Sequence, residues 1–168
     1  MKSDSLRFLG YREGDIGRLT LLHATYYHEH WGFDLSFEAQ VARELSEFLL
    51  RADPARDHFE AAWLGERFLG GVAIDGSSTP EQGARLRWFM VDPESQGRGV
   101  GRALIARALD FCRAAGHRRV YLWTFQGLEP ARRLYQDAGF ILAEEHQVQQ
   151  WGNLIIEQLY QLDLGEKT

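Results

Sequence analysis

Apolar residues recur along the chain at two spacings, one typical of helices and the other typical of strands. Spacings of three and four residues predict helices over residues 15–31, 36–51, 100–115 and 129–138. Short extended apolar runs predict strands over residues 6–11, 58–64, 67–74, 84–91, 119–125, 139–148 and 153–164. Helices come early, followed by a hairpin, a strand-helix-strand-helix unit and two more strands. This order predicts an α/β fold whose sheet has mixed strand directions.

Polar residues and glycines mark where these elements begin and end. Asp15 and Ser36 are predicted to cap the first two helices, and Gly116 is predicted to end the third. Gly65 and Glu66 separate two strands, which indicates a β-hairpin. The 168 residues contain no internal repeat, low-complexity tract or linker. A single domain over residues 1–168 is therefore expected.

The composition is that of an ordinary globular protein, with 45% hydrophobic and 26% charged residues. The net charge of -5 favours neither nucleic acid nor an anionic membrane as a partner, because both attract basic surfaces. Cys112 is the only cysteine, which excludes an internal disulfide and a cysteine-rich metal site. No segment approaches the ~20 apolar residues of a membrane span, and the N-terminus lacks a signal-peptide pattern. A cytoplasmic location is expected.

Three alternating glycines, Gly97, Gly99 and Gly101, stand between a predicted strand and a predicted helix. The first amides of a helix are unpaired and carry a partial positive charge. Glycines in front of them let a ligand approach the backbone closely, which together makes a cradle for phosphate. Arg98 and Arg102 can add charged donors. The pattern predicts a phosphate-binding turn rather than a turn shaped only for chain reversal.

Two common nucleotide-binding motifs do not fit this turn. A Walker A loop needs a Gly-Lys-Ser/Thr triplet, which the chain lacks. A dinucleotide fingerprint needs a third glycine where Arg102 stands, and an acidic residue after the next strand. Residues 118–127 contain no carboxylate.

The segment from Gln96 to Gly101 resembles the pyrophosphate-binding loop of the GNAT superfamily of acyl-CoA N-acyltransferases. Residues 131–140, "ARRLYQDAGF", resemble the last helix of that family and the Gly-Phe entry to the following strand. The resemblance extends over residues 6–164. It implies a GNAT fold, with a mixed, mostly antiparallel sheet of about seven strands flanked by about four helices. A closer likeness, to the acetyltransferase half of regulators that fuse a winged helix-turn-helix domain to a GNAT domain, rests on residues 14–17, 26–42, 122–124 and 131–140.

The resemblance implies transfer of an acetyl group from acetyl-CoA to a primary amine of a small molecule or peptide, by direct attack and without a metal. The alternative is an acyl-CoA-binding sensor with weak catalysis. An N–H near Met90 or Val91 would point at the thioester oxygen. The loop that would hold the pyrophosphate comprises Gln96, Gly97, Arg98, Gly99, Val100, Gly101, Arg102 and Ala103.

Tyr135 matches the family tyrosine that hydrogen-bonds the CoA sulfur, which implies that it is the general acid. Leu128 stands where many members carry an asparagine, so one CoA contact is expected to be replaced.

No carboxylate lies on the strand before the loop, which carries Arg85 and Arg87 instead. Glu29 is our candidate base, chosen from a set that also contains His28, His30, Glu60 and His146. Tyr27, Trp31 and Asp34 are predicted to line the acceptor site, with Asp34 attracting a cationic amine. The apolar run over residues 154–162 could serve a homodimer or an internal strand.

Overall fold

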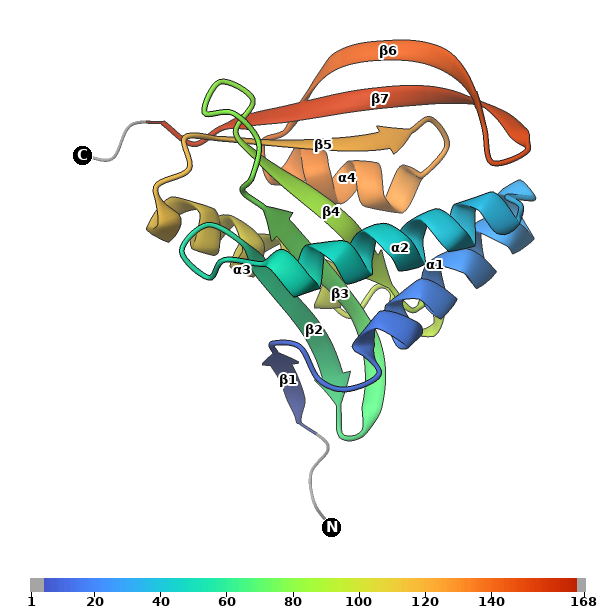
Figure 1. Cartoon of the computed structure of the whole chain (residues 1–168), viewed down its shortest axis with the longest axis horizontal. Helices are drawn as coiled ribbons and strands as arrows, with labels where there is room; N and C mark the ends of the chain where they lie inside the picture. The colour runs from blue at the N-terminus through green and yellow to red at the C-terminus, as the bar shows by residue number, and fades with distance from the viewer. Residues whose placement is uncertain (1–4, 166–168) are drawn as a thin grey trace.

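Seven strands form one sheet in the order β1-β2-β3-β4-β5-β7-β6 (Figure 1). The computed structural model describes residues 5–165, so the two ends of the predicted 1–168 domain lie outside the described residues. The strands are β1 (Leu6–Leu9), β2 (His58–Leu64), β3 (Arg67–Asp75), β4 (Ala84–Val91), β5 (Arg119–Phe125), β6 (Ile141–Gln150) and β7 (Asn153–Asp163). All neighbours are antiparallel except β4 and β5. The predicted mixed sheet is confirmed.

Helices cover both faces of the sheet (Figure 1). They are α1 (Asp15–Trp31), α2 (Leu35–Arg51), α3 (Val100–Ala115) and α4 (Glu129–Asp137), with a short 3-10 helix, η1 (Pro93–Ser95), after β4. The helices α1 and α2 lie on one face, while α3 and α4 lie on the other. The four helices and the hairpin between β2 and β3 appear where the pattern predicts them.

Two predicted helix caps are wrong, although the helices are right. The N-cap of α1 is Gly14 in the left-handed conformation, and Asp15 is instead buried, its carboxylate accepting the Arg12 N–H at 2.8 Å. The N-cap of α2 is Asp34, which accepts the Ser36 N–H at 2.9 Å. The Asp34 carboxylate therefore caps α2 in place of the predicted Ser36 side chain. Gly116 ends α3 as predicted.

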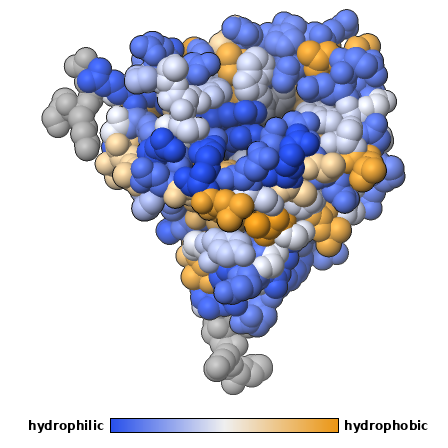
Figure 2. Space-filling model, in the orientation of Figure 1, coloured by the Kyte–Doolittle hydropathy of each residue, from blue (hydrophilic) through white to orange (hydrophobic). Residues whose placement is uncertain are grey.

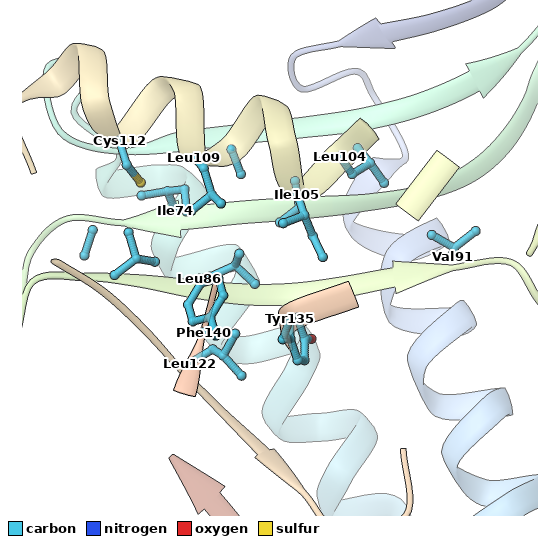
Figure 3. Packing of buried hydrophobic residues seen from close by; sticks show 14 of the residues in the cluster. Ile74, Leu86, Val91, Leu104, Ile105, Leu109, Cys112, Leu122, Tyr135 and Phe140 are labelled. Atoms are coloured by element: carbon cyan, nitrogen blue, oxygen red, sulfur yellow. The ribbon is translucent and has the colours of Figure 1, made fainter. Parts of the chain in front are cut away.

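Apolar side chains fill the space on both sides of the sheet. Beneath α3 and α4, Ile74, Leu104 and Leu122 belong to one continuous cluster (Figure 3). Beneath α1 and α2 lies a second cluster that includes Leu19 and Phe48. A third cluster, rich in aromatic residues, lies at the ends of β5 and β7. Burial on both faces holds the sheet rigidly between the helices.

A bulge in β4 separates the sheet locally. Trp88 has a φ of +50°, and the register with β3 shifts so that two residues of β4 oppose one of β3. On its other side β4 pairs with β5 only through Ala84 and Arg85. Beyond these residues the two strands part, and the β5 side of β4 has no strand partner.

The molecular face in Figure 2 is mostly hydrophilic, with hydrophobic residues in small separate groups. Among residues 5–165, no helix is long and apolar enough to cross a membrane.

Candidate active site

Two cavities meet at the gap between β4 and β5. The first, the glycine-loop cavity, lies beside residues 96–102 and has a volume of about 450 Å³. The second, the aromatic cavity, lies between α2 and the strands β4, β5 and β7 and has a volume of about 380 Å³. Four residues line both cavities and so form their junction, namely Tyr27, Phe89, Leu128 and Ala131. The two cavities therefore adjoin each other at these residues.

The glycine loop, residues 96–103, opens its backbone toward the first cavity. Gly97 and Gly99 both have a φ of +81°, and an added Cβ at either would meet nothing within 4 Å. Gly101 differs, because a Cβ there would come within 3.0 Å of Leu134. Within residues 5–165 no backbone oxygen accepts the N–H of residues 97–99, and the first amides of α3 have no intrahelical partner. The loop is an open anion cradle.

The loop residues predicted to bind the pyrophosphate divide into three groups. Gln96, Gly97, Gly99, Gly101 and Arg102 line the cavity together with Met90 and Val91. Val100 turns its side chain into the core, and Ala103 donates its N–H to the Gly99 oxygen at 3.0 Å. Arg98 is exposed. Arg102 also forms an ion pair with Asp137 at 2.8 Å.

The end of β4 offers one amide to the gap. The Asp92 N–H donates to the Leu69 oxygen at 2.7 Å, toward β3. Peptide groups alternate in direction along a strand, so the Val91 N–H faces away from β3 and toward the gap. Met90, one residue earlier, directs its own N–H toward β3. Of the two amides predicted from the sequence, Val91 has the suitable direction.

Tyr135 on α4 lines the aromatic cavity and packs among the buried residues of the core (Figure 3). The side chain is buried, and its ring packs against Phe140 with centroids 6.0 Å apart. No residue in the described part of the chain forms a hydrogen bond with its hydroxyl group. Burial raises the pKa of this phenol, so it stays protonated at neutral pH and can donate a proton or a hydrogen bond.

Two carboxylates that no sequence pattern singles out, those of Glu44 and Glu157, line the aromatic cavity. Glu44 on α2 forms an ion pair with Arg87 at 2.5 Å. Glu157 on β7 lies 3.1 Å from His146 Nε2. Neither belongs to a local motif, and only the packing of α2 and β7 around the gap brings them into the cavity.

The buried imidazole of His23 also lines the aromatic cavity. Burial lowers its pKa to about 4, and its Nδ1 lies 2.8 Å from the Leu19 oxygen. Because a carbonyl oxygen only accepts, this nitrogen carries the proton. His23 is neutral at physiological pH.

The residues predicted to line the acceptor site are only partly brought together. Tyr27 lines both cavities, and burial together with the neighbouring Tyr135 raises its pKa. Trp31 packs edge-on against Phe125 at 4.9 Å and lines neither cavity. Asp34 is occupied as the cap of α2. Glu29, the candidate base, is exposed in the last turn of α1 and also lies outside both linings.

The other base candidates have structural contacts of their own. Glu60 binds Arg107 through both carboxylate oxygens, with a shortest distance of 2.6 Å. Burial alone would raise the pKa of Glu60, but the nearby His58 imidazole, 3.6 Å away, and the hydrogen bonds from Arg107 outweigh it and hold the pKa at about 2. His28 and His30 lie at the exposed end of α1. No group of metal-binding side chains occurs within residues 5–165.

Comparison with known proteins agrees with this geometry. The sequence profile of the Acetyltransferase (GNAT) family matches residues 18–140. The chain is 28% identical over 136 residues to the uncharacterized N-acetyltransferase MJ1207 of Methanocaldococcus jannaschii, covering 77% of this chain and 58% of that protein. It is 37% identical over 92 residues to a mycothiol acetyltransferase of Geodermatophilus obscurus, covering 52% of this chain and 29% of that protein.

Solved structures share the fold. A GNAT-family acetyltransferase from Staphylococcus aureus Mu50 superposes with a TM-score of 0.76 at 14% identity, covering 96% of this chain and 100% of that one. The yncA protein of Salmonella typhimurium, solved with its cofactor acetyl-CoA, gives 0.72 at 16% identity, covering 96% and 95%.

The chain therefore belongs to the acetyltransferase (GNAT) family. It spans little more than half of the length of MJ1207 and less than a third of the mycothiol acetyltransferase. None of the relatives named above is described as a helix-turn-helix regulator, so the closer likeness suggested by the sequence gains no support.

Proposed function

We propose that the protein transfers an acetyl group from acetyl-CoA to a primary amine. The observation that carries this proposal is the junction of the two cavities. A phosphate cradle opens into one cavity, an unpartnered buried phenol reaches the other, and Tyr27, Phe89, Leu128 and Ala131 line both.

Acetyl-CoA fits the glycine-loop cavity in three respects. The open amides at Gly97 and Gly99 suit a diphosphate, which needs close backbone approach. The unpaired edge of β4 suits the amide-bearing pantetheine arm, which can add as a short strand. Arg133 lines the same cavity, is exposed and has no ion-pair partner in the described part of the chain. This guanidinium would bind a CoA phosphate.

The reaction would be a direct displacement at the thioester carbon. The amine nitrogen bonds to the acetyl carbon as the carbon–sulfur bond breaks. The Val91 N–H would stabilise the oxygen that gains charge. Tyr135 would donate its proton to the departing thiolate.

The acceptor ammonium must lose a proton before it attacks. Glu157 is the carboxylate of the aromatic cavity that no arginine neutralises within residues 5–165, and His146 holds it from the exposed side. We assign Glu157 as the base, in place of Glu29, because Glu157 lines the cavity and Glu29 does not.

Thiol release tests the transferase against the alternative of an acyl-CoA sensor. A panel of primary amines is mixed with acetyl-CoA and protein, and calorimetry measures acetyl-CoA binding separately. Amine-dependent thiol release supports the transferase. Binding without release on any amine would establish the sensor, and absence of binding would overturn both.

A homodimer, if it forms through the late strands, would use β6. The apolar run over residues 154–162 lies in β7, which is enclosed by β5 and β6. Exposed Ile141 and Leu142 on β6 would contribute. Light scattering, which measures molar mass, tests this.

A further inference from the structure

Arg85 lines the aromatic cavity, and among residues 5–165 no carboxylate forms an ion pair with it. Its side chain is half-buried and lines the cavity from β4. Its buried Nε has no hydrogen-bond partner among residues 5–165. Burial and the nearby positive charge of Arg87 lower the pKa of this guanidinium. A partly desolvated charge of this kind gains strongly from an anionic partner.

The surrounding carboxylates are already paired. Arg87 binds Glu44 at 2.5 Å, and Arg51 binds Asp75 at 2.7 Å. Asp57, which lies outside the cavity, is 3.3 Å from Arg56. Arg85 forms no ion pair within residues 5–165, and its side chain lines the cavity.

The strand register separates this cation from the proposed base. Arg85 pairs with Tyr121 on β5, whereas Glu157 pairs with Phe125. Four residues along β5 correspond to about 13 Å at about 3.3 Å per residue. Side chains stand roughly perpendicular to a sheet, so the two charged groups stay well apart. Glu157 is at the end near Leu128, where the cavities join, because Phe125 and Leu128 share one cluster.

We propose that the acceptor is a zwitterionic amine whose anionic group, a carboxylate or a group of similar charge, binds Arg85 several atoms away from the reacting nitrogen. The amine lies beside Glu157 and the anion lies at the far end of the cavity. In an α-amino acid a single carbon separates the two groups, so a longer spacing suits the site better. This inference names the substrate class of the proposed transferase and rests on that function.

Three amines of similar length provide the test, with thiol release as the readout. They are 6-aminohexanoate, norleucine and hexylamine, in which the carboxylate is distant, adjacent or absent. We expect kcat/KM for 6-aminohexanoate to exceed both others by about ten- to a hundred-fold, the range for a charge-assisted hydrogen bond. Arg85→Gln should remove this advantage, so that kcat/KM for 6-aminohexanoate no longer exceeds that for hexylamine. Arg118→Gln, the same change at an exposed site outside both cavities, should alter nothing.

Equal rates for 6-aminohexanoate and hexylamine in the wild type would overturn the anion site while leaving the transferase intact. A preference for norleucine would overturn the spacing. If no amine is acetylated, calorimetry with 6-acetamidohexanoate in the presence of CoA decides the matter. Binding that is lost in Arg85→Gln would support the anion site without the transferase, and absence of binding to the wild type would overturn the site.

Discussion

The ring of Tyr135 meets the ring of Phe89 edge-on, with their centroids 5.9 Å apart. Phe89 lies on β4 at the junction of the two cavities, and Tyr135 comes from α4. This contact between aromatic rings holds Tyr135, which lines the aromatic cavity, beside a residue that lines both cavities.

Tyr135→Phe should lower kcat by about 10²-fold or more, because general acid catalysis typically contributes 10² to 10⁴. Stability should change little, since no described residue bonds the lost hydroxyl. The assay is steady-state thiol release, with thermal unfolding alongside. Tyr160→Phe is the control, because this neighbouring buried tyrosine lines neither cavity. An equal loss of kcat in both variants would contradict the assignment.

Gly99→Ala should weaken acetyl-CoA binding by about ten-fold or more, because a methyl group over the loop blocks close approach of phosphate. Gly116→Ala is the matched control. Its φ of +85° is nearly that of Gly99, and its Cβ would also meet nothing, but it lies at the other end of α3. Both variants should lose about 1 kcal/mol of stability from left-handed strain. Calorimetry should find weaker binding only in Gly99→Ala, and equal affinities would refute the cradle.

Glu157→Gln should reduce kcat by about 10²-fold or more if the carboxylate takes the amine proton. The pH profile of kcat should change with it, which a purely structural role would not produce. Glu144→Gln removes the same charge from an exposed position on β6 and should leave the profile unchanged. An unaltered profile in Glu157→Gln would remove this residue from the mechanism.

The ion pair of Glu60 with Arg107 should make stability depend on acid pH. The pKa of Glu60 is lowered to about 2 from a reference value of 4.5. A lowered carboxyl pKa adds stability that is complete above the unfolded value and is lost as pH falls toward the folded value. The contribution at pH 7 is at most about 3 kcal/mol.

Urea unfolding of the wild type and Glu60→Gln at several pH values measures this contribution. The difference in unfolding free energy should be largest at pH 7 and should shrink between about pH 5 and pH 2. A difference independent of pH would show that the lowered pKa is wrong. Thiol release at pH 7 should survive in the folded variant, because Glu60 lies outside both cavities.

Local patterns in the sequence were sufficient for the secondary structure and the loop. The spacing of Leu104 and Ala108 on α3 depends on helical geometry within one segment, as does the alternation along the strands. The glycines at 97 and 99 are adjacent in the chain to the helix whose amides they expose. Tyr135 could be chosen because its motif, residues 131–140, is contiguous.

The general base and the acceptor site could not be predicted from local sequence patterns. Glu29 stands in an aromatic stretch of the sequence, yet the rotation of α1 turns it to solvent. Asp34 was predicted to attract an amine, but its carboxylate caps α2 by accepting the Ser36 N–H. Both predictions judged a residue by its chain neighbours, whereas the lining of a cavity depends on how distant segments pack.

Taken alone, the chain determined its helices, its strands and the glycine turn before α3, because each depends on interactions between residues a few positions apart. Only the tertiary structure decided that β4 and β5 separate. The bulge in β4 lies at Trp88, and no glycine marks this position in the sequence. Only the packing of distant strands placed Arg85 and Glu157 in one cavity. Their presence in one cavity depends on strand pairing between segments some seventy residues apart, which cannot be predicted from local spacing.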